Sequence, residues 1–190
     1  ERADIFSMRT LIDFGGIAKG YTGQKLAELF QEYGVSSALV SLGGNIQAIG
    51  TKPDGSSWKV GIRDPKGGQQ DYIGVLSVEN QAVVTSGGYE RYFEEDGETY
   101  IHIINPRTGY PADGDLLSVT IVSKDGTLAD GMSTALYIMG YEKACQFWRQ
   151  HREGFNVILV TDDGKIHISE NLKGNFQTEW ELEMIESGSE

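Results

Sequence analysis

Glycine divides this chain into short segments: 25 of its 190 residues are glycine, spread along the sequence without a fixed repeat. Glycine adopts backbone conformations that other residues avoid, so it marks turns and the ends of elements. Many of the segments between these turns are short and rich in β-branched residues, which is typical of strands. We therefore expect many short strands joined by tight turns.

Three segments instead show helical spacing of their apolar residues: 17–33, 127–139 and 141–151, the last two separated by Gly140. Strands are predicted at 37–42, 46–50, 58–63, 73–78, 82–85, 89–93, 99–104, 116–123, 155–161 and 165–169. Short connections favour antiparallel pairs, including a hairpin of 46–50 with 58–63. The pattern predicts an α+β fold with a mostly antiparallel sheet and a few packed helices.

The composition fits a single domain, predicted at residues 1–180 and followed by an acidic tail at 181–190. A formal net charge of −12 argues against nucleic acid as a partner, because phosphate backbones need a basic face. No apolar run is long enough to cross a bilayer, so no transmembrane segment is expected. The single cysteine, Cys145, is predicted to pack in the interior, and His151 and His167 are predicted to be surface residues.

The segment 13–21 places two glycines directly before a predicted helix. Backbone N–H groups and the positive end of the helix would then point the same way, which suits an anion. Gly16 would let a phosphate approach the backbone, and Lys19 would add a positive charge. The alternative is a glycine turn that packs closely, with Lys19 in solvent.

Two further glycine pairs follow predicted strands. Gly43, Gly44 and Asn45 come after the first strand, where glycine would let a flat ligand approach closely. Ser86 and Gly87 come after another strand and could supply a hydroxyl and an N–H group to phosphate or flavin. The alternative at Gly43 and Gly44 is a tight turn into Ile46, which that segment taken alone favours.

His102 lies in an apolar run that is predicted to be a strand, just before a Pro/Gly loop that carries Arg107. A histidine in this setting is either a hydrogen-bonded core residue or a general base that works near neutral pH. Arg107 could contact phosphate or cap the end of the strand.

Asp130 and Thr134 are four residues apart at the start of a predicted helix, so both side chains share one face. A carboxylate and a hydroxyl form part of a suitable shell for Mg²⁺, which takes oxygen ligands and keeps waters or substrate phosphate. The alternative is a carboxylate that stabilises the helix N-terminus and a threonine bonded to the helix backbone.

Taken in order, segments 13–21, 41–46, 85–89, 102–111 and 129–134 resemble the ApbE-type FAD:protein FMN transferase family over nearly the whole chain. The resemblance implies FAD as donor, Mg²⁺ as cofactor and an acceptor protein that presents a threonine, with AMP as leaving group. It implies that Ala18 gives a backbone carbonyl to the metal, together with Asp130 and Thr134. His102 stands at the position of the family's catalytic base, and the fold expected is the ApbE, T-fold-like domain.

The chain departs from the family pattern in two places. Members usually carry a further N-terminal portion, so these residues are expected to be a C-terminal portion or a shortened member whose cleft is open on one side. Asn105 stands where the family commonly has Asp.

The alternatives to transfer are FAD hydrolysis to FMN and AMP, or an FAD-binding fragment without activity. The family also implies an extracytoplasmic location, in some members as a lipoprotein.

Overall fold

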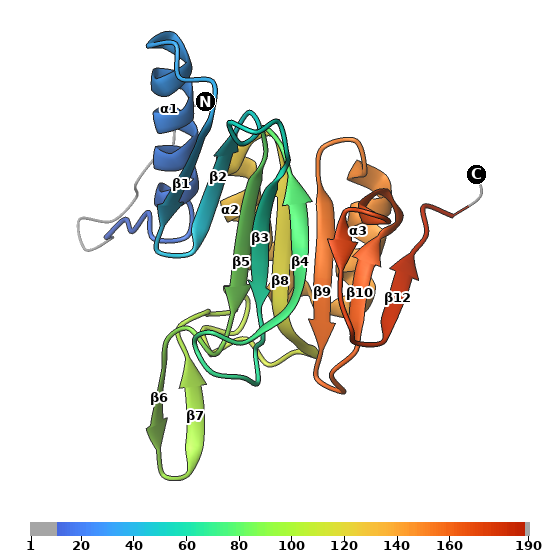
Figure 1. Ribbon diagram of the computed structural model, residues 1–190. Helices are drawn as coiled ribbons and strands as arrows, with labels where there is room; N and C mark the ends of the chain where they lie inside the picture. Colours follow the sequence, from blue (N-terminus) through green and yellow to red (C-terminus); the bar gives the residue numbers. More distant parts are fainter. Residues whose placement is uncertain (1–10, 189–190) are drawn as a thin grey trace.

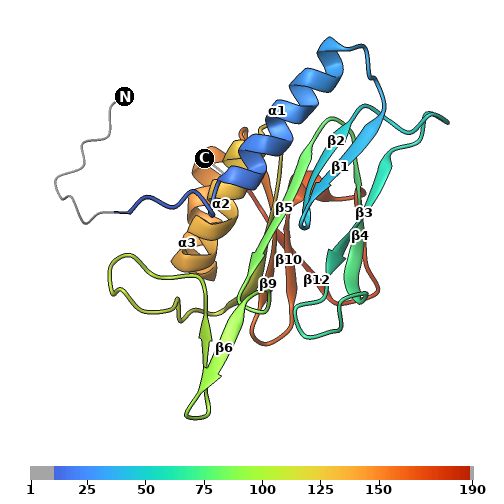
Figure 2. The same ribbon diagram turned by 90° about the vertical axis from the view of Figure 1, so that its left-hand side faces the viewer.

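The computed structural model describes residues 11–188, and three layers make up this part of the chain (Figures 1 and 2). Three helices cover one face of a seven-stranded sheet, and a three-stranded sheet covers the other face. The helices are α1 (Ala18–Glu32), α2 (Gly126–Met139) and α3 (Tyr141–His151). A two-stranded hairpin projects from one end of the molecule.

The large sheet has the strand order β1-β2-β5-β8-β9-β10-β12, and its pairs are antiparallel except for β10 with β12. Its strands are β1 (Ala38–Leu42), β2 (Asn45–Ile49), β5 (Ala82–Gly87), β8 (Leu116–Ser123), β9 (Asn156–Thr161), β10 (Ile166–Ser169) and β12 (Leu182–Ile185). The small sheet joins β11 (Phe176–Gln177), β4 (Tyr72–Val78) and β3 (Trp58–Arg63), and the hairpin joins β6 (Tyr92–Glu95) to β7 (Glu98–Ile101). A short 3-10 helix, Glu170–Leu172, follows β10. This architecture confirms the predicted α+β fold with a mostly antiparallel sheet.

The central strands are buried on both faces because side chains alternate along a strand. On β9, Val157 and Leu159 join the core under the helices, whereas Ile158 and Val160 join the core under the small sheet. Trp148 of α3 fills the helix-side core, and its Nε1–H donates to the carbonyl of Phe155 at 3.0 Å. The large sheet therefore supports two separate hydrophobic cores.

Helices α1 and α2 cross at glycines. A Cβ atom built on Gly20 would lie 2.5 Å from the Cβ of Asp130 and would overlap the carbonyl oxygen of Gly126. Asp125 begins α2 by accepting hydrogen bonds from the N–H groups of Thr127 and Leu128. Gly140, at φ +80°, separates α2 from α3 as predicted. The close approach of the two helices depends on the missing side chain of Gly20.

The predicted hairpin of 46–50 with 58–63 was wrong. Strand β2 pairs with β1 and β5 in the large sheet, whereas β3 pairs with β4 in the small sheet. Ala48 of β2 and Ile62 of β3 belong to the same core. The two strands therefore face each other across the layers, because burial of both apolar faces prevails over pairing of neighbours in the sequence.

Two other expectations need correction near the C-terminus. The segment predicted to be an acidic tail, 181–190, includes β12, which pairs in parallel with β10 and buries Ile185. His167 was predicted to be at the surface, but it is only 5% exposed. Its Nδ1 lies 3.1 Å from the Tyr141 hydroxyl and 3.4 Å from a Glu183 carboxylate oxygen, so β12 and α3 cover it. His151 is exposed and Cys145 is buried, as predicted.

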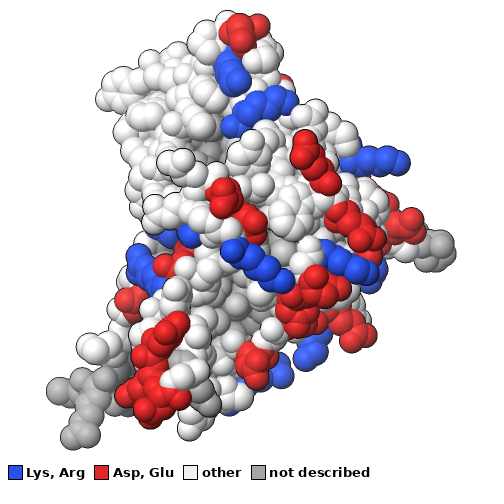
Figure 3. All heavy atoms as spheres, turned by 60° about the horizontal axis from the view of Figure 1, so that its bottom comes forward, with Lys and Arg blue, Asp and Glu red and all other residues white. Residues whose placement is uncertain are grey.

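Within residues 11–188, no helix is both long and apolar enough to cross a membrane. On the face that Figure 3 shows, acidic and basic side chains are interspersed, and a group of acidic ones lies at its lower left. The tip of the hairpin carries exposed Glu94, Glu95 and Asp96. On this face, charges of both signs are therefore mixed except in that acidic group.

The helix crossing predicts opposite effects for two glycine substitutions. Gly20→Ala should lower the free energy of unfolding by about 1–3 kcal/mol, because the added methyl group has no space beside Gly126 and Asp130. Gly131→Ala, in α2, meets its nearest atom at 3.8 Å and should raise it by about 0.4–1 kcal/mol. Urea unfolding of both variants measures this. Equal stability of the two variants would contradict the predicted steric contact.

The environment of His167 predicts a pH-dependent stability. Burial lowers the pKa of His167 below its ordinary 6.5, against the opposing influence of Glu183 and Asp163. The unfolded chain therefore takes up a proton more readily than the folded one. The free energy of unfolding should hold above about pH 6.5 and fall as the pH decreases toward the lowered folded pKa.

The substitution His167→Gln removes this titration and should flatten the decrease between about pH 7 and 5.5. His151→Gln, at an exposed position, is the matched control and should leave the wild-type pH dependence in place. Chemical unfolding at a series of pH values measures both. A pH slope that His167→Gln leaves unchanged would rule out His167 as its source.

Candidate functional site

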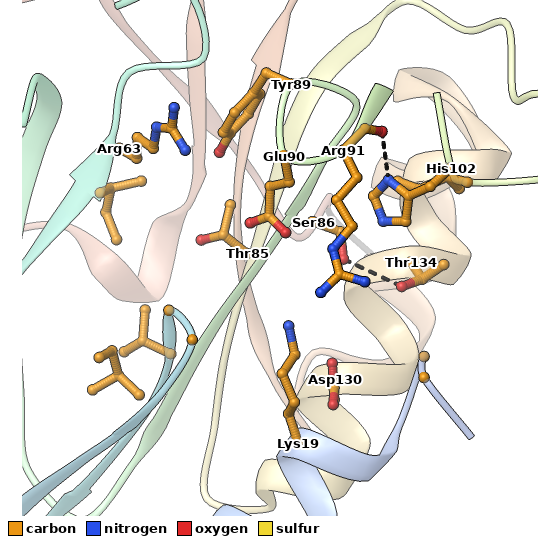
Figure 4. A pocket seen from close by; sticks show the side chains of 18 of the residues that line it. Lys19, Arg63, Thr85, Ser86, Tyr89, Glu90, Arg91, His102, Asp130 and Thr134 are labelled. Atoms are coloured by element: carbon orange, nitrogen blue, oxygen red, sulfur yellow. Dashed lines mark hydrogen bonds between the residues drawn. The ribbon is translucent and has the colours of Figure 1, made fainter. Parts of the chain in front are cut away.

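One large cavity, of about 1250 Å³, lies between the start of α1, the β1–β2 turn, β3, the end of β5, α2 and the base of the hairpin (Figure 4). Segments that are far apart in the sequence therefore line a single space. Nine of the residues that the sequence marked as candidates lie in its wall: Gly16, Ala18, Lys19, Gly43, Gly44, Ser86, His102, Asp130 and Thr134. The volume is sufficient for a ligand of dinucleotide size.

The N-terminus of α1 opens into the cavity. The turn before it is closed by backbone hydrogen bonds from Ile17 and Ala18 to the carbonyl of Phe14, at 3.0 and 2.8 Å. No side chain caps the helix. Gly16, Ala18 and Lys19 line the cavity here, so the helix presents its positive end and a lysine together.

The carboxylate of Asp130 joins α1 to α2. It is 4% exposed, and one oxygen, Oδ2, accepts a hydrogen bond from the N–H of Gly20 at 2.7 Å. The other oxygen, Oδ1, accepts no hydrogen bond from residues 11–188. A buried carboxylate with a free oxygen at the wall of a cavity is suited to a cation or to a further donor.

Hydroxyl groups continue this oxygen-rich wall. Ser86 Oγ lies 2.8 Å from Ser133 Oγ and 3.2 Å from Thr134 Oγ1, and the hydroxyl of Ser133 also donates to the backbone carbonyl of Asp130 at 2.8 Å. The end of β5 is thereby held against the same face of α2 that carries Asp130. Thr134 and Asp130 both line the cavity, which agrees with the predicted shared face of the helix.

This donor set fits Mg²⁺, which takes oxygen ligands and retains waters or substrate phosphate. In the part of the chain that the structure describes, no three His, Cys, Asp or Glu side chains lie close enough to hold a metal by themselves. A cation beside Asp130 would therefore need the Thr134 hydroxyl, a backbone carbonyl such as that of Ala18, and oxygens from water or a ligand.

His102 was predicted to lie inside a strand, but β7 ends at Ile101 and His102 follows it. The side chain is exposed and lines the cavity, and its Nδ1 is 3.0 Å from the backbone carbonyl oxygen of Arg91. The position is therefore open to a ligand and to solvent, unlike that of a core histidine.

Three predicted cofactor-binding residues do not line the cavity. Asn45 is buried under α1, facing Gly23. Gly87 is buried, and a Cβ atom there would overlap the ring of Tyr89 and approach the carbonyl of Leu117 to 2.9 Å. Arg107 is exposed in a turn, where its backbone N–H donates a hydrogen bond to Asn105 Oδ1 at 3.0 Å.

Several cationic and aromatic side chains in the wall were not identified from the sequence. The guanidinium carbon of Arg63 lies 4.8 Å from the ring centroid of Tyr89, a cation–π contact. Burial raises the pKa of Tyr89 to about 12, so this phenol keeps its proton. Arg91 and Lys59 also line the cavity. Tyr89 and Arg91 follow the Ser86–Gly87 pair closely in the sequence, and this proximity to a candidate binding segment could have identified them.

Comparison with known proteins identifies the family of this chain. Residues 5–159 match the family model described as the ApbE family. The FAD:protein FMN transferase of Treponema pallidum (strain Nichols) is 43% identical over 166 residues, and that of Klebsiella pneumoniae (strain 342) is 42% identical over 158 residues. Both alignments cover 83% of this chain, with 46% and 48% of the relative, so the chain spans about half the length of these curated relatives.

Solved structures of ApbE proteins are also similar to this chain. The crystal structure of the ApbE protein from Thermotoga maritima superposes with a TM-score of 0.78 at 38% identity, and covers 86% of this chain and 53% of its own. The flavin transferase ApbE from Vibrio cholerae superposes with a TM-score of 0.74 at 32% identity, and covers 86% of this chain and 52% of its own.

The placement of the cationic residues predicts which of them matter for ligand binding. Lys19→Met should weaken the binding of inorganic pyrophosphate by about tenfold or more, because a charged hydrogen bond contributes about 1.5–3 kcal/mol. Arg107→Met should change the affinity by less than about twofold, since Arg107 lies outside the cavity. Calorimetric titration with inorganic pyrophosphate measures both. An equal loss in the two variants would mean that the ligand extends to the 105–110 turn.

Proposed function

Because the chain belongs to the ApbE family, we propose that the protein transfers FMN from FAD to a threonine hydroxyl of an acceptor protein and releases AMP. The observation that carries this proposal is the single cavity that gathers Lys19, His102, Asp130 and Thr134 from α1, the hairpin and α2. A helix N-terminus with a lysine suits a pyrophosphate, and an exposed histidine in the wall of the same cavity suits a general base.

The proposed reaction needs one proton acceptor and one positioned phosphate. The acceptor threonine Oγ attacks the phosphorus on the FMN side of the FAD pyrophosphate, and His102 accepts the threonine proton. The bond from that phosphorus to the bridging oxygen breaks, and its electron pair leaves on the phosphate of AMP. His102 then gives its proton to the AMP phosphate or to water. Lys19 and the N–H groups that begin α1 hold the pyrophosphate during this step.

Mg²⁺ belongs to the proposal, with the Ala18 carbonyl, Asp130 and Thr134 as its protein ligands. When bound, the ion would neutralise charge on the pyrophosphate of the donor. The residues themselves support this assignment, because Asp130 keeps one oxygen free of hydrogen bonds within residues 11–188 and Thr134 Oγ1 lines the same wall. The location outside the cytoplasm that the resemblance implies remains a prediction.

Hydrolysis of FAD to FMN and AMP is a second candidate function. His102 is exposed, so water can reach the ring from the same side as an acceptor hydroxyl. With water as nucleophile, the same residues would perform the same proton transfer. The relative rates of transfer and hydrolysis then depend on how well the acceptor excludes water from the cavity.

The test is incubation of the protein with FAD, Mg²⁺ and a candidate acceptor, followed by intact-mass analysis of the acceptor. Transfer gives an acceptor heavier by one FMN group, and an acceptor whose threonine is replaced by valine stays unmodified. Release of free FMN and AMP without a modified acceptor would indicate the hydrolase. Unchanged FAD in the presence of Mg²⁺ and acceptor would contradict both functions.

The base assignment predicts a large kinetic effect. His102→Ala should lower the rate of FMN transfer by about 10²–10⁴-fold, the usual effect of removing a general base. FAD affinity should change far less, because the imidazole does not hold the pyrophosphate. Single-turnover kinetics with saturating FAD separate the two quantities. A rate within a few-fold of wild type would assign His102 to a role other than the base.

The metal assignment predicts a loss of Mg²⁺ dependence. Asp130→Asn retains an oxygen that can accept the Gly20 N–H, so the fold should persist while the negative charge is lost. Turnover of FAD should then fall to the level of the metal-free wild type at every Mg²⁺ concentration. Rates measured across an Mg²⁺ series test this. A variant that Mg²⁺ stimulates as strongly as wild type would place the metal elsewhere.

A further inference from the structure

Arg91 has two separate links to the site, one through its side chain and one through its backbone. It lies between β5 and β6, at the base of the projecting hairpin, and it lines the cavity. We propose that its guanidinium binds the pyrophosphate of FAD while its carbonyl oxygen fixes the tautomer and orientation of His102. This inference rests on the proposed function and adds a substrate-binding and positioning residue to it.

The side chain is placed for an anion. Figure 4 shows the guanidinium of Arg91 pointing into the cavity, from the side opposite Lys19 and toward Thr134. Its guanidinium forms no ion pair or hydrogen bond with any residue in the range 11–188, although Glu90 is its neighbour in the chain and also lines the cavity.

An arginine without a partner, aimed into a cavity, presents its planar donors to whatever binds there. Guanidinium groups match phosphate oxygens in a bidentate manner, which a lysine cannot do. Lys19 and Arg91 would thus hold the two phosphates of the donor from opposite sides, next to the oxygens of Asp130 and Thr134.

The backbone of the same residue holds His102. The carbonyl oxygen of Arg91 accepts the backbone N–H of His102 at 3.1 Å and lies 3.0 Å from its ring Nδ1. A carbonyl oxygen can only accept hydrogen bonds, so Nδ1 must carry the hydrogen in the neutral ring. Nε2 is then unprotonated and available to take a proton from the acceptor hydroxyl.

The register of the hairpin explains why these two residues meet. Strands β6 and β7 pair with Tyr92 opposite Ile101, so the next residues outward, Arg91 and His102, face each other at the base of the hairpin. Any movement of this end of the hairpin would therefore shift both Arg91, the proposed phosphate-binding residue, and His102, the proposed proton acceptor. The two functions are separable by mutation, because a change of the Arg91 side chain leaves its carbonyl in place.

Binding of the donor tests the side-chain half. Arg91→Met should weaken the affinity for FAD by about tenfold or more, and Arg91→Lys should restore part of it through its charge. Lys143→Met, an exposed charge on α3 outside the cavity, is the matched control and should stay within about twofold of wild type. Calorimetric titration with FAD and with inorganic pyrophosphate measures this. Wild-type affinity of Arg91→Met for both ligands would overturn the proposal.

The tautomer tests the backbone half. Ring ¹⁵N NMR of the wild type, with His102→Gln used to assign the signals, should show neutral His102 protonated at Nδ1 and unprotonated at Nε2. Arg91→Met should give the same pattern, because the carbonyl is retained. A neutral His102 that is protonated at Nε2 would overturn this half of the proposal.

The outcomes also separate the inference from the proposed function. If Arg91→Met loses FAD affinity but the wild type transfers no FMN and hydrolyses no FAD, the role of Arg91 in binding stands and the proposed reaction fails. If the wild type reacts and Arg91→Met binds FAD normally, the reaction stands and the role of Arg91 fails. A wild type that does not bind FAD would overturn both.

Discussion

The hydrogen bond between the Gly20 amide and the Asp130 carboxylate determines where the rest of the site lies. It joins the first turn of α1 to the second turn of α2 across 110 residues of sequence, in a buried position. The missing side chain of Gly20 allows the helices to approach until the backbone of α1 touches α2. Because a buried carboxylate needs a partner, this contact holds Ala18 and Lys19 beside the oxygens of α2.

The large sheet supplies the other constraint. Strand β5 lies between β2 and β8 in this sheet, and its last residues bring Ser86 into contact with Ser133 and Thr134. The chain then leaves the sheet and forms the hairpin before it returns as β8, and Arg91 and His102 flank the hairpin, so this one excursion brings both to the cavity. In a chain of net charge −12, the cavity wall carries four basic side chains, Lys19, Lys59, Arg63 and Arg91, against the acidic Asp13, Glu90 and Asp130, which suits the pyrophosphate of the proposed donor.

Local features could be predicted from the sequence because they depend on neighbours in the chain. The helix break at Gly140 and the shared face of Asp130 and Thr134 follow from spacing and glycine alone, and the structure contains both. The order of the motifs carried the family resemblance, and the resemblance led to the proposed function. The ApbE family match confirms that resemblance.

The errors arose where a distant partner decides the outcome. His167 looked like a surface residue because its cover, β12 and Tyr141, comes from segments that local patterns do not connect to it. Residues 46–50 and 58–63 looked like a hairpin, but each strand has a better partner in a different sheet. Arg91 was missed for the same reason, since only the hairpin register places it beside His102.

One measurement tests most directly whether the two helices and the hairpin form one phosphate and metal site. Mn²⁺ prefers oxygen ligands as Mg²⁺ does, and its paramagnetism broadens NMR signals of nearby nuclei. Titrated into the ¹⁵N-labelled protein with FAD, Mn²⁺ should broaden the amide signals of Ala18, Ser86 and Thr134 together, before those of the acidic hairpin tip. Broadening confined to Glu94–Asp96, with Ala18 and Thr134 unaffected, would contradict a common site.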